Sequence, residues 1–423
     1  MIKLLTEFLW IIATFMIFSC GIYFAFKLKF VHLRFGKMFR AMREENSGKI
    51  SHFQSLMIAL AGRIGVGSLA GIALAVYIGG PGVIFWIWLT SFLCASNAFV
   101  ESYLGVIFRK KEGDIYQGGP FYYISEGLRN KRLGIFYALI FLVSYIGGFL
   151  TVQINTMTKS INSLVPISPL FIGIIICILA GTTIIGGVKK IANVTGKLIP
   201  IVTIFYLAMG TFIILSNWSF VPQVFSDIIS SALNFKAFGA GVLVTMLLGM
   251  QKGIFSSELG LGSGAVAASL SSGETPASNG YVQTLGIHIE NLLIATMTVL
   301  VICLSNYQSL EIADANGIEL TLHAFSYHFG SIGNLFIVIT ISLFGLSTIL
   351  SGYYYGESAL KFLKKTKQID IYLLKILTLG LLVIGSVISS NLLWKAVDIM
   401  VALIAIINIY ALFKLRKAVK IYF

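Results

Sequence analysis

The sequence predicts an all-α polytopic membrane protein with about 11 transmembrane helices, and three observations support this fold class. Of its 423 residues, 57% are hydrophobic and only 11% are charged, against roughly a quarter charged in an ordinary soluble domain. The lysine and arginine residues gather in short segments between apolar runs. Glycine collects inside two of those runs, beside polar side chains.

This composition excludes two broad classes of protein. A soluble chain of this length cannot bury so much apolar surface, and a mean hydropathy of +0.90 does not suit a disordered chain. The net charge of +14 would fit a nucleic-acid-binding protein, but the basic residues lie where they set membrane orientation. We therefore expect a lipid bilayer around the chain and no nucleic acid partner.

A transmembrane helix needs about 20 mainly apolar residues, and the sequence contains eleven such runs. They cover residues 4–27, 53–79, 82–108, 133–160, 167–187, 196–216, 237–268, 279–304, 331–360, 370–389 and 391–414. The first run has no small-residue cleavage site after it, so we interpret it as a retained helix rather than a signal peptide. Residues 218–234 predict an amphipathic helix at the membrane surface.

The segments between these runs predict how the chain is oriented. With the N-terminus outside, the inner segments hold 24 of the 31 basic residues and the outer segments hold 3. The inner segments are 27–52, 109–132, 188–197, 269–278, 361–369 and the tail from residue 414. Because lysine and arginine favour the cytoplasmic side, we expect a multi-pass protein of the cell (inner or plasma) membrane with a cytoplasmic C-terminus. The outer segment 305–330 is acidic, with Glu311, Asp314 and Glu319.

Two of the apolar runs contain breaks. The second contains AGRIGVGSLAG at residues 61–71, and the seventh contains GIFSSELGLGSG at residues 253–264. Glycine inside a helix costs roughly 1 kcal/mol relative to alanine, so each stretch should unwind locally. Unwound backbone within a bilayer lines protein or a water-filled cavity, where its N–H groups hold carboxylates and its carbonyls hold cations. The alternative is that these glycines only permit close helix packing.

The spacing of the two breaks predicts an internal repeat. If each break opens a unit of five helices, the units cover residues 53–216 and 237–414. Five is odd, so the two units have opposite orientations in the membrane, as in many secondary transporters. Residues 1–30 then form an extra N-terminal transmembrane helix, and residues 415–423 form a cytoplasmic tail.

At these residues the sequence resembles the sodium:alanine/glycine symporters, also called the alanine or glycine:cation symporter family. The resemblance covers nearly the whole chain and is carried by GRIGVGSLAGIALAVYIGGPGVIFWIW (62–88), GGPFYYISEGL (118–128), FSSELGLGSGAVAAS (255–269) and STILSGYYYGESAL (347–360). It implies the inverted-repeat fold of the bacterial leucine transporter and symport of a small neutral amino acid by alternating access. It also implies Na+ as the coupling ion, with no other metal, no cofactor and no enzymatic activity.

The resemblance further implies which residues bind the two solutes. For the amino acid these are Val66, Gly67, Ser68, Gln153, Ser256, Ser257, Gly260 and Gly352, with Asn155 lining the same cavity as Gln153. For sodium they are the carbonyls of Ala61, Ile64 and Phe344 and the hydroxyls of Ser347 and Thr348. A hard cation prefers such oxygen ligands, although Ser and Thr hydroxyls in helices often bond only to their own backbone.

The sequence departs from the usual pattern of the family in three places. It has Asn at Ser68, Ser-Asn-Glu-Ala-Gly at residues 256–260, and Trp at Gly352. An indole buries about 150–250 Å², so its loss predicts an enlarged or reshaped pocket. The substrate would then be a neutral amino acid larger than alanine.

Several alternatives remain open at the level of sequence. Arg63 and Glu258 could form a gating charge pair, since a buried charge needs a partner, or the Arg63 cation could replace an ion. A proton-coupled transporter on the same fold would give a role to His288, whereas the absence of a lysine near Thr348 favours sodium. A membrane enzyme would need a polar cluster at one interface, and a sensor would bind the amino acid without moving it.

Overall fold

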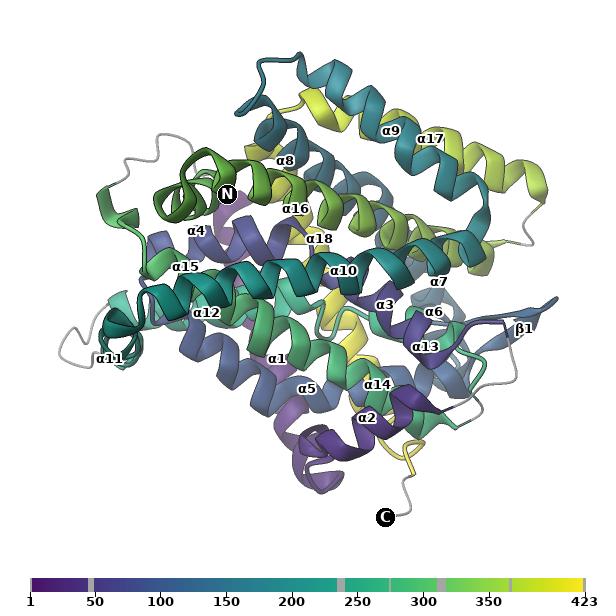
Figure 1. Cartoon of the computed structure of the whole chain (residues 1–423). Helices are drawn as coiled ribbons and strands as arrows, with labels where there is room; N and C mark the ends of the chain where they lie inside the picture. Colours follow the sequence, from purple (N-terminus) through teal and green to yellow (C-terminus); the bar gives the residue numbers. More distant parts are fainter. Residues whose placement is uncertain are drawn as a thin grey trace.

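A computed structural model gives the fold of residues 2–44, 49–233, 240–273, 275–309, 317–364 and 367–420 (Figure 1). Over these residues the chain is helical except for one short hairpin, in which β1 (Lys110–Glu112) pairs antiparallel with β2 (Ile115–Gln117). The acidic residues Glu311 and Asp314 lie outside the described residues. The predicted all-α class is therefore confirmed for the part that the structure describes.

The helices follow the apolar runs of the sequence. The first group is α1 (Ile2–Lys27), η1 (Val31–Leu33), α2 (Phe35–Arg43), α3 (His52–Arg63), η2 (Gly67–Gly71), α4 (Ile72–Gly79), α5 (Val83–Ile107), α6 (Pro120–Tyr122), η3 (Tyr123–Gly127), α7 (Lys131–Leu142), η4 (Val143–Phe149), α8 (Leu150–Asn162), α9 (Pro169–Ile185) and α10 (Gly187–Ser216). The second group is η5 (Trp218–Phe220), α11 (Val221–Ala232), α12 (Ala240–Ser257), α13 (Ser263–Leu270), α14 (Pro276–His288), η7 (Ile289–Ile294), α15 (Ala295–Cys303), η8 (Tyr307–Ser309), α16 (Gly317–Leu363), α17 (Gln368–Val387) and α18 (Ser390–Lys414).

Among the described residues, eight helical segments are long and apolar enough to cross a membrane, which identifies a multi-pass membrane protein. They are Leu4–Lys27, Val83–Ile107, Lys131–Asn162, Gly187–Ser216, Pro276–Cys303, Gly317–Leu363, Gln368–Val387 and Ala396–Lys414. A ninth is the pair His52–Arg63 and Gly67–Gly79, bent by 48°. The number of 11 stays a prediction, because α9 has only 17 residues and α12 is separated from α13 by a turn.

Both helix breaks occur where the glycine pattern predicts them. Helix α3 ends at Arg63, and regular structure resumes at Gly67 as one π-helical turn before α4. Helix α12 ends at Ser257 and α13 begins at Ser263. Between them, Glu258, Gly260 and Gly262 have φ of 52°, 77° and 84°, the left-handed region that glycine adopts without strain.

Two predicted helix boundaries are wrong. Helix α10 begins at Gly187 instead of residue 196, because its first turns carry exposed lysines beyond the apolar run. Helix α16 begins at Gly317 instead of residue 331 and kinks at Gly330, whose φ of 58° and ψ of −140° interrupt the helix. Residues 317–329 were predicted as part of an outer loop, because apolar periodicity does not distinguish a short packed helix from a loop at a span's end.

The arrangement of helices places the two breaks inside the molecule. Figure 1 shows α9 and α17 packed against each other at the edge, with α11 and the β1 strand at opposite ends of the helices. Helix α5 packs against α12, α13 and α14, and α16 packs against α3, η2 and α8. The residues of both breaks that are described below are buried.

Candidate functional site

The first helix break is held by a glutamine from α8. The amide N–H of Val66 donates to Gln153 Oε1 at 3.0 Å, and both residues are buried. A Cβ atom at Gly65 would lie 3.1 Å from the same Gln153 oxygen and 2.5 Å from Thr348 Oγ1. The glycine therefore allows α8, α16 and the break to meet.

The residues expected to hold sodium lie together at the carbonyl end of α3. The Thr348 hydroxyl lies 2.8 Å from the Ala61 carbonyl oxygen and 2.9 Å from the Phe344 carbonyl oxygen, and it donates to one of them at a time. The Ser347 hydroxyl donates to the Phe344 carbonyl at 2.7 Å. Ile64 ends α3 next to this group. The donor set consists of neutral oxygen atoms, which fits a small hard cation.

Ser68 contacts a carboxylate that sequence reasoning did not connect to the site. Its hydroxyl lies 2.6 Å from Glu290 Oε1 and 3.0 Å from the Arg63 carbonyl oxygen. Glu290 is fully buried in η7, and its position in an apolar run was the signal that could have identified it. Ser68 thus links the first break to η7, the π-helical turn that follows α14.

The predicted charge pair of Arg63 and Glu258 is not formed in this structure. Arg63 Nη1 donates to the Gln283 carbonyl at 3.1 Å, while Nη2 and Nε have no hydrogen-bond partner among the described residues. The Glu258 carboxylate instead accepts hydrogen bonds from the hydroxyls of Tyr145 and Ser263, each at 2.8 Å. These two hydroxyls satisfy both carboxylate oxygens and so remove the need for the guanidinium.

The second break is fixed by side chains from three other helices. Asn408 Nδ2 donates to the Gly260 carbonyl at 2.9 Å and to Glu101 Oε2 at 3.1 Å. Tyr137 donates to the Leu261 carbonyl at 2.7 Å. A Cβ atom at Gly260 would lie 3.0 Å from Ile409 Cδ1, so Gly260 packs against α18 in this structure. That Gly260 also faces the substrate stays a prediction.

The two breaks meet at Gly67 and Ser256. A Cβ atom at Gly67 would lie 3.9 Å from Ser256 Cα and 3.4 Å from the Phe255 ring. The Ser256 hydroxyl is buried and lies near the Glu290 carboxylate, although no hydrogen bond of good geometry joins them. The Ser257 hydroxyl, in contrast, donates to the Gly253 carbonyl of its own helix at 2.5 Å. Of these two hydroxyls, only that of Ser257 is therefore bonded to its own helix.

Two further residues do not lie as expected. A Cβ atom at Gly352 would lie 2.5 Å from Leu150 Cδ1, so the Leu150 side chain occupies the space that was predicted to enlarge the pocket. Asn155 Nδ2 donates to the Gly385 and Ile388 carbonyls at 3.0 and 2.7 Å. It holds the end of α17 and does not line the cavity with Gln153, because residues two apart on a helix face different directions.

A small cavity of about 100 Å³ adjoins the first break. It is lined by Ala70, Gly71, Leu74, Lys252, Gly317, Trp394 and Asp398. The Lys252 ammonium lies 5.6 Å from the Trp394 ring centre, and Asp398 Oδ1 is buried without a hydrogen-bond partner among the described residues. A water occupies about 30 Å³, so the cavity has room for a few waters between opposite charges.

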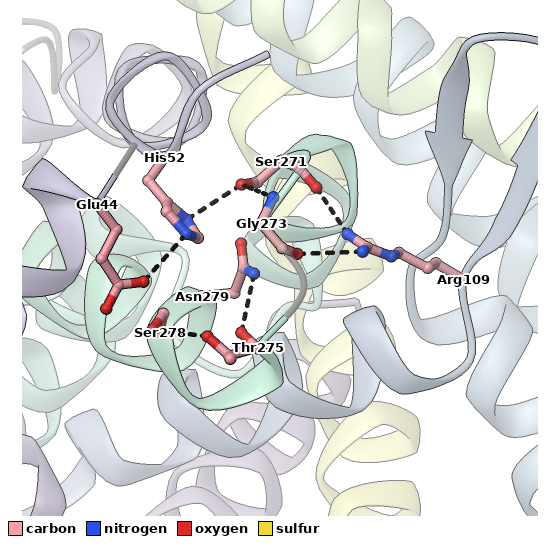
Figure 2. Close-up of polar contacts among 8 residues, drawn as sticks. All are labelled: Glu44, His52, Arg109, Ser271, Gly273, Thr275, Ser278 and Asn279. Atoms are coloured by element: carbon pink, nitrogen blue, oxygen red, sulfur yellow. Dashed lines mark hydrogen bonds and ion pairs between the residues drawn. The ribbon is translucent and has the colours of Figure 1, made fainter. Parts of the chain in front are cut away.

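The other end of α3 is tied to the loop that follows α13 (Figure 2). His52 Nδ1 lies 3.0 Å from the Ser271 hydroxyl, and Glu44 lies 3.7 Å from His52 Nε2. Arg109 donates to the Ser271 and Gly273 carbonyls at 2.6 and 3.1 Å. These contacts join the start of α3 to the segment after α13, on the side away from the small cavity, and sequence patterns did not indicate them.

The chain matches the family model for the sodium:alanine symporter family over residues 1–422. It is 35% identical over 410 residues to the probable sodium/glutamine symporter GlnT of Bacillus subtilis (strain 168), covering 96% of this chain and 85% of that protein. It is 31% identical over 428 residues to the amino-acid carrier protein AlsT of the same organism, covering 100% and 91%. It is 33% identical over 386 residues to the sodium/alanine symporter AgcS of Methanococcus maripaludis, covering 89% and 84%.

A solved structure has a similar fold. The structure is a Na+-coupled sialic acid symporter in a substrate-bound, outward-open state. The TM-score is 0.55 and the sequence identity 13%, with 98% of this chain and 83% of that chain covered. At this identity the likeness applies to the fold alone.

Proposed function

This chain belongs to the sodium:alanine symporter family, and from that premise we propose that it takes up a small neutral amino acid together with Na+ by alternating access. The observation that carries the proposal is the contact between Thr348 and Ala61. It joins the carbonyl end of the broken α3 to α16, through oxygen atoms that suit a sodium ion.

In the proposed cycle, Na+ binds between α3 and α16. The carbonyls of Ala61, Ile64 and Phe344 and the hydroxyls of Ser347 and Thr348 are the proposed ligands. The ion replaces the hydrogen bonds of the Thr348 hydroxyl as the link between the two helices. Because a bound ion stabilises one arrangement of α3 relative to α16, it raises the population of the conformation that binds the amino acid.

The amino acid is proposed to bind at the junction of the breaks. Its carboxylate accepts hydrogen bonds from the Val66 and Gly67 amides and displaces Gln153 Oε1, which holds the Val66 amide in this structure. Its ammonium group lies near the Ser256 hydroxyl, beside the buried Glu290 carboxylate. Because Leu150 fills the space beside Gly352, the pocket suits a small side chain, and alanine is the first substrate to test. Glutamine, which the name of one relative gives, is the larger substrate to test beside it.

We propose that the small cavity beside the break is the route by which the amino acid arrives. Lys252 and Asp398 line it with opposite charges, which suits a zwitterion. The contacts of His52, Arg109 and Ser271 close the opposite end. With the N-terminus outside, as the basic loops predict, the cavity faces outward and residues 53–216 and 237–414 form the two inverted repeats.

The test is uptake of radiolabelled L-alanine and L-glutamine into proteoliposomes that contain the purified chain. An inward Na+ gradient should drive accumulation of at least one of them, whereas an equal K+ gradient should not. A pH gradient without Na+ is the discriminating condition. Uptake that follows the pH gradient alone would overturn the sodium assignment, and no uptake of any neutral amino acid would overturn the transport proposal.

A further inference from the structure

A second and larger cavity lies at the hairpin end of the molecule, where Figure 1 places β1, α6 and α7. Its volume is about 640 Å³. Its polar wall contains five lysines and two glutamates: Lys110, Lys111, Lys131, Lys361, Lys364, Glu112 and Glu126. The lysines come from β1, from the start of α7 and from the end of α16, so the fold gathers charges that are distant in sequence.

Acidic partners neutralise only part of this charge. Lys110 pairs with Glu126, Lys361 with Glu357 at 2.8 Å, and Lys364 with Asp370 at 2.6 Å. Lys111 and Lys131 are exposed and have no acidic partner among the described residues. Among the described residues that line the cavity, Glu112 is the one other carboxylate. The cavity therefore keeps an excess of positive charge, which favours an anionic group.

Part of the cavity lining is apolar and continues along a predicted span. It contains Ile135, Phe362 and Leu363. On α7 and the π-helical turn after it, Ile135, Leu139 and Val143 follow at intervals of four residues and are 37%, 47% and 56% exposed. They belong to the apolar segment Lys131–Asn162, so an exposed face of that segment would contact lipid chains. The charged cavity thus lies beside an exposed apolar helix face that a hydrocarbon chain can contact.

We propose that this cavity binds the phosphate headgroup of an anionic phospholipid. Lys111 and Lys131 contact the phosphate, and an acyl chain lies along Ile135, Leu139 and Val143. Basic pockets at the ends of transmembrane helices recognise such headgroups through charge. A free phosphate ion would also pair with the lysines, but it would make no contact with the apolar residues. This difference distinguishes a lipid headgroup from a free phosphate ion as the bound anion.

The experiment measures lipid binding by the full-length chain in detergent and does not depend on transport. The probes are dioleoylphosphatidylglycerol, dioleoylphosphatidylcholine and inorganic phosphate, and native mass spectrometry counts the bound molecules. We expect the anionic lipid to bind at least fivefold better than phosphatidylcholine. The double variant Lys111→Gln/Lys131→Gln should reduce this preference to less than twofold. The matched control Lys417→Gln/Lys420→Gln removes two exposed charges elsewhere and should retain it.

Two outcomes would overturn the proposal. One is an unchanged preference for phosphatidylglycerol in the double variant, which would place lipid binding elsewhere. The other is displacement of the lipid by inorganic phosphate at equal concentration, which would make the cavity a site for the free ion. Thermal unfolding in phosphatidylcholine checks that the double variant is folded, because surface lysine substitutions away from ion pairs change stability little.

Discussion

The side-chain oxygen of Gln153 accepts a hydrogen bond from the Val66 amide at 3.0 Å, inside the first helix break. The amide is one of the two proposed to bind the carboxylate of the amino acid. In this structure Gln153 therefore accepts from the amide that is proposed to bind the substrate carboxylate. A neutral side-chain oxygen satisfies this donor at little cost and gives way to a carboxylate, whose hydrogen bonds are stronger.

Replacing Gln153 by a charged residue of the same shape should weaken substrate binding. In Gln153→Glu the new carboxylate would face the carboxylate of the amino acid. Two unit charges 4 Å apart repel by about 4 kcal/mol at an effective dielectric constant of 20, so we expect KM for L-alanine to rise at least tenfold. The control Gln223→Glu makes the same change on the exposed face of α11. An unchanged KM in Gln153→Glu would contradict the assignment of the Val66 amide.

A methyl group at Gly65 should disrupt the same junction. Its Cβ atom would lie 2.5 Å from Thr348 Oγ1, a distance at which one of the two helices must move. We expect Gly65→Ala to reduce sodium-dependent uptake at least tenfold. Gly147→Ala adds a methyl group to a nearby span where the nearest atom is 3.9 Å away, and its uptake should stay within twofold of the original. Equal activity of the two variants would show that the junction tolerates movement.

Removal of the Thr348 hydroxyl should act on sodium more than on the amino acid. Thr348→Val keeps the shape of the side chain but removes one proposed ligand and the link to the Ala61 carbonyl. We expect the Na+ concentration for half-maximal uptake to rise at least tenfold. Thr340→Val on the same helix removes a hydroxyl that lies 2.8 Å from the Phe336 carbonyl of its own helix and serves as the control. Identical sodium curves for the two variants would place the ion elsewhere.

The sequence predicted features that depend on local pattern. The apolar runs and the glycines at residues 65–71 and 260–264 identify the spans and their breaks, because an unwound turn requires flexible residues wherever the rest of the fold lies. The position of Thr348 near Ala61 followed only from the resemblance to a family. The structure adds to it the hydrogen bonds that bring the two residues together.

The sequence did not predict which way the residues of each break face. Gly260 was expected at the substrate, and sequence patterns did not indicate that its carbonyl accepts from Asn408. Glu258 was paired with Arg63, but it accepts from Tyr145 and Ser263. These contacts depend on how each helix is rotated about its axis against distant helices. Hydropathy and spacing carry no such information when a helix is buried on all sides.

Asn408 should contribute to stability through the second break. Its side chain donates to Gly260 and Glu101 and accepts a hydrogen bond from Tyr123. Asn408→Ala leaves buried groups without partners, each at a cost of about 1–3 kcal/mol, so we expect the midpoint of thermal unfolding in detergent to fall by several degrees. Asn217→Ala removes a partly exposed side chain with one hydrogen bond at the end of α10 and should change it little. A similar midpoint in both variants would contradict this role.

Acid should destabilise the chain through His32, which lies between α1 and α2. Burial lowers the pKa of His32 below its usual value, and its hydrogen bond to the Phe92 carbonyl opposes this only in part. Nδ1 is buried without a partner among the described residues, so the folded state resists a second proton. The His32 side chain of the unfolded state gains a proton below about pH 6.5. The stability that comes from neutral His32 is therefore present above pH 6.5 and is lost as the pH falls.

In the variant His32→Gln the side-chain amide can donate to the Phe92 carbonyl without titrating. The neighbouring His288, which contacts the His32 carbonyl, is unchanged in this variant. Between pH 7.5 and 5.5 the midpoint of thermal unfolding should fall further in the original chain than in His32→Gln. The corresponding difference in the free energy of unfolding is at most about 1.4 kcal/mol per pH unit. Parallel curves would show that His32 does not contribute.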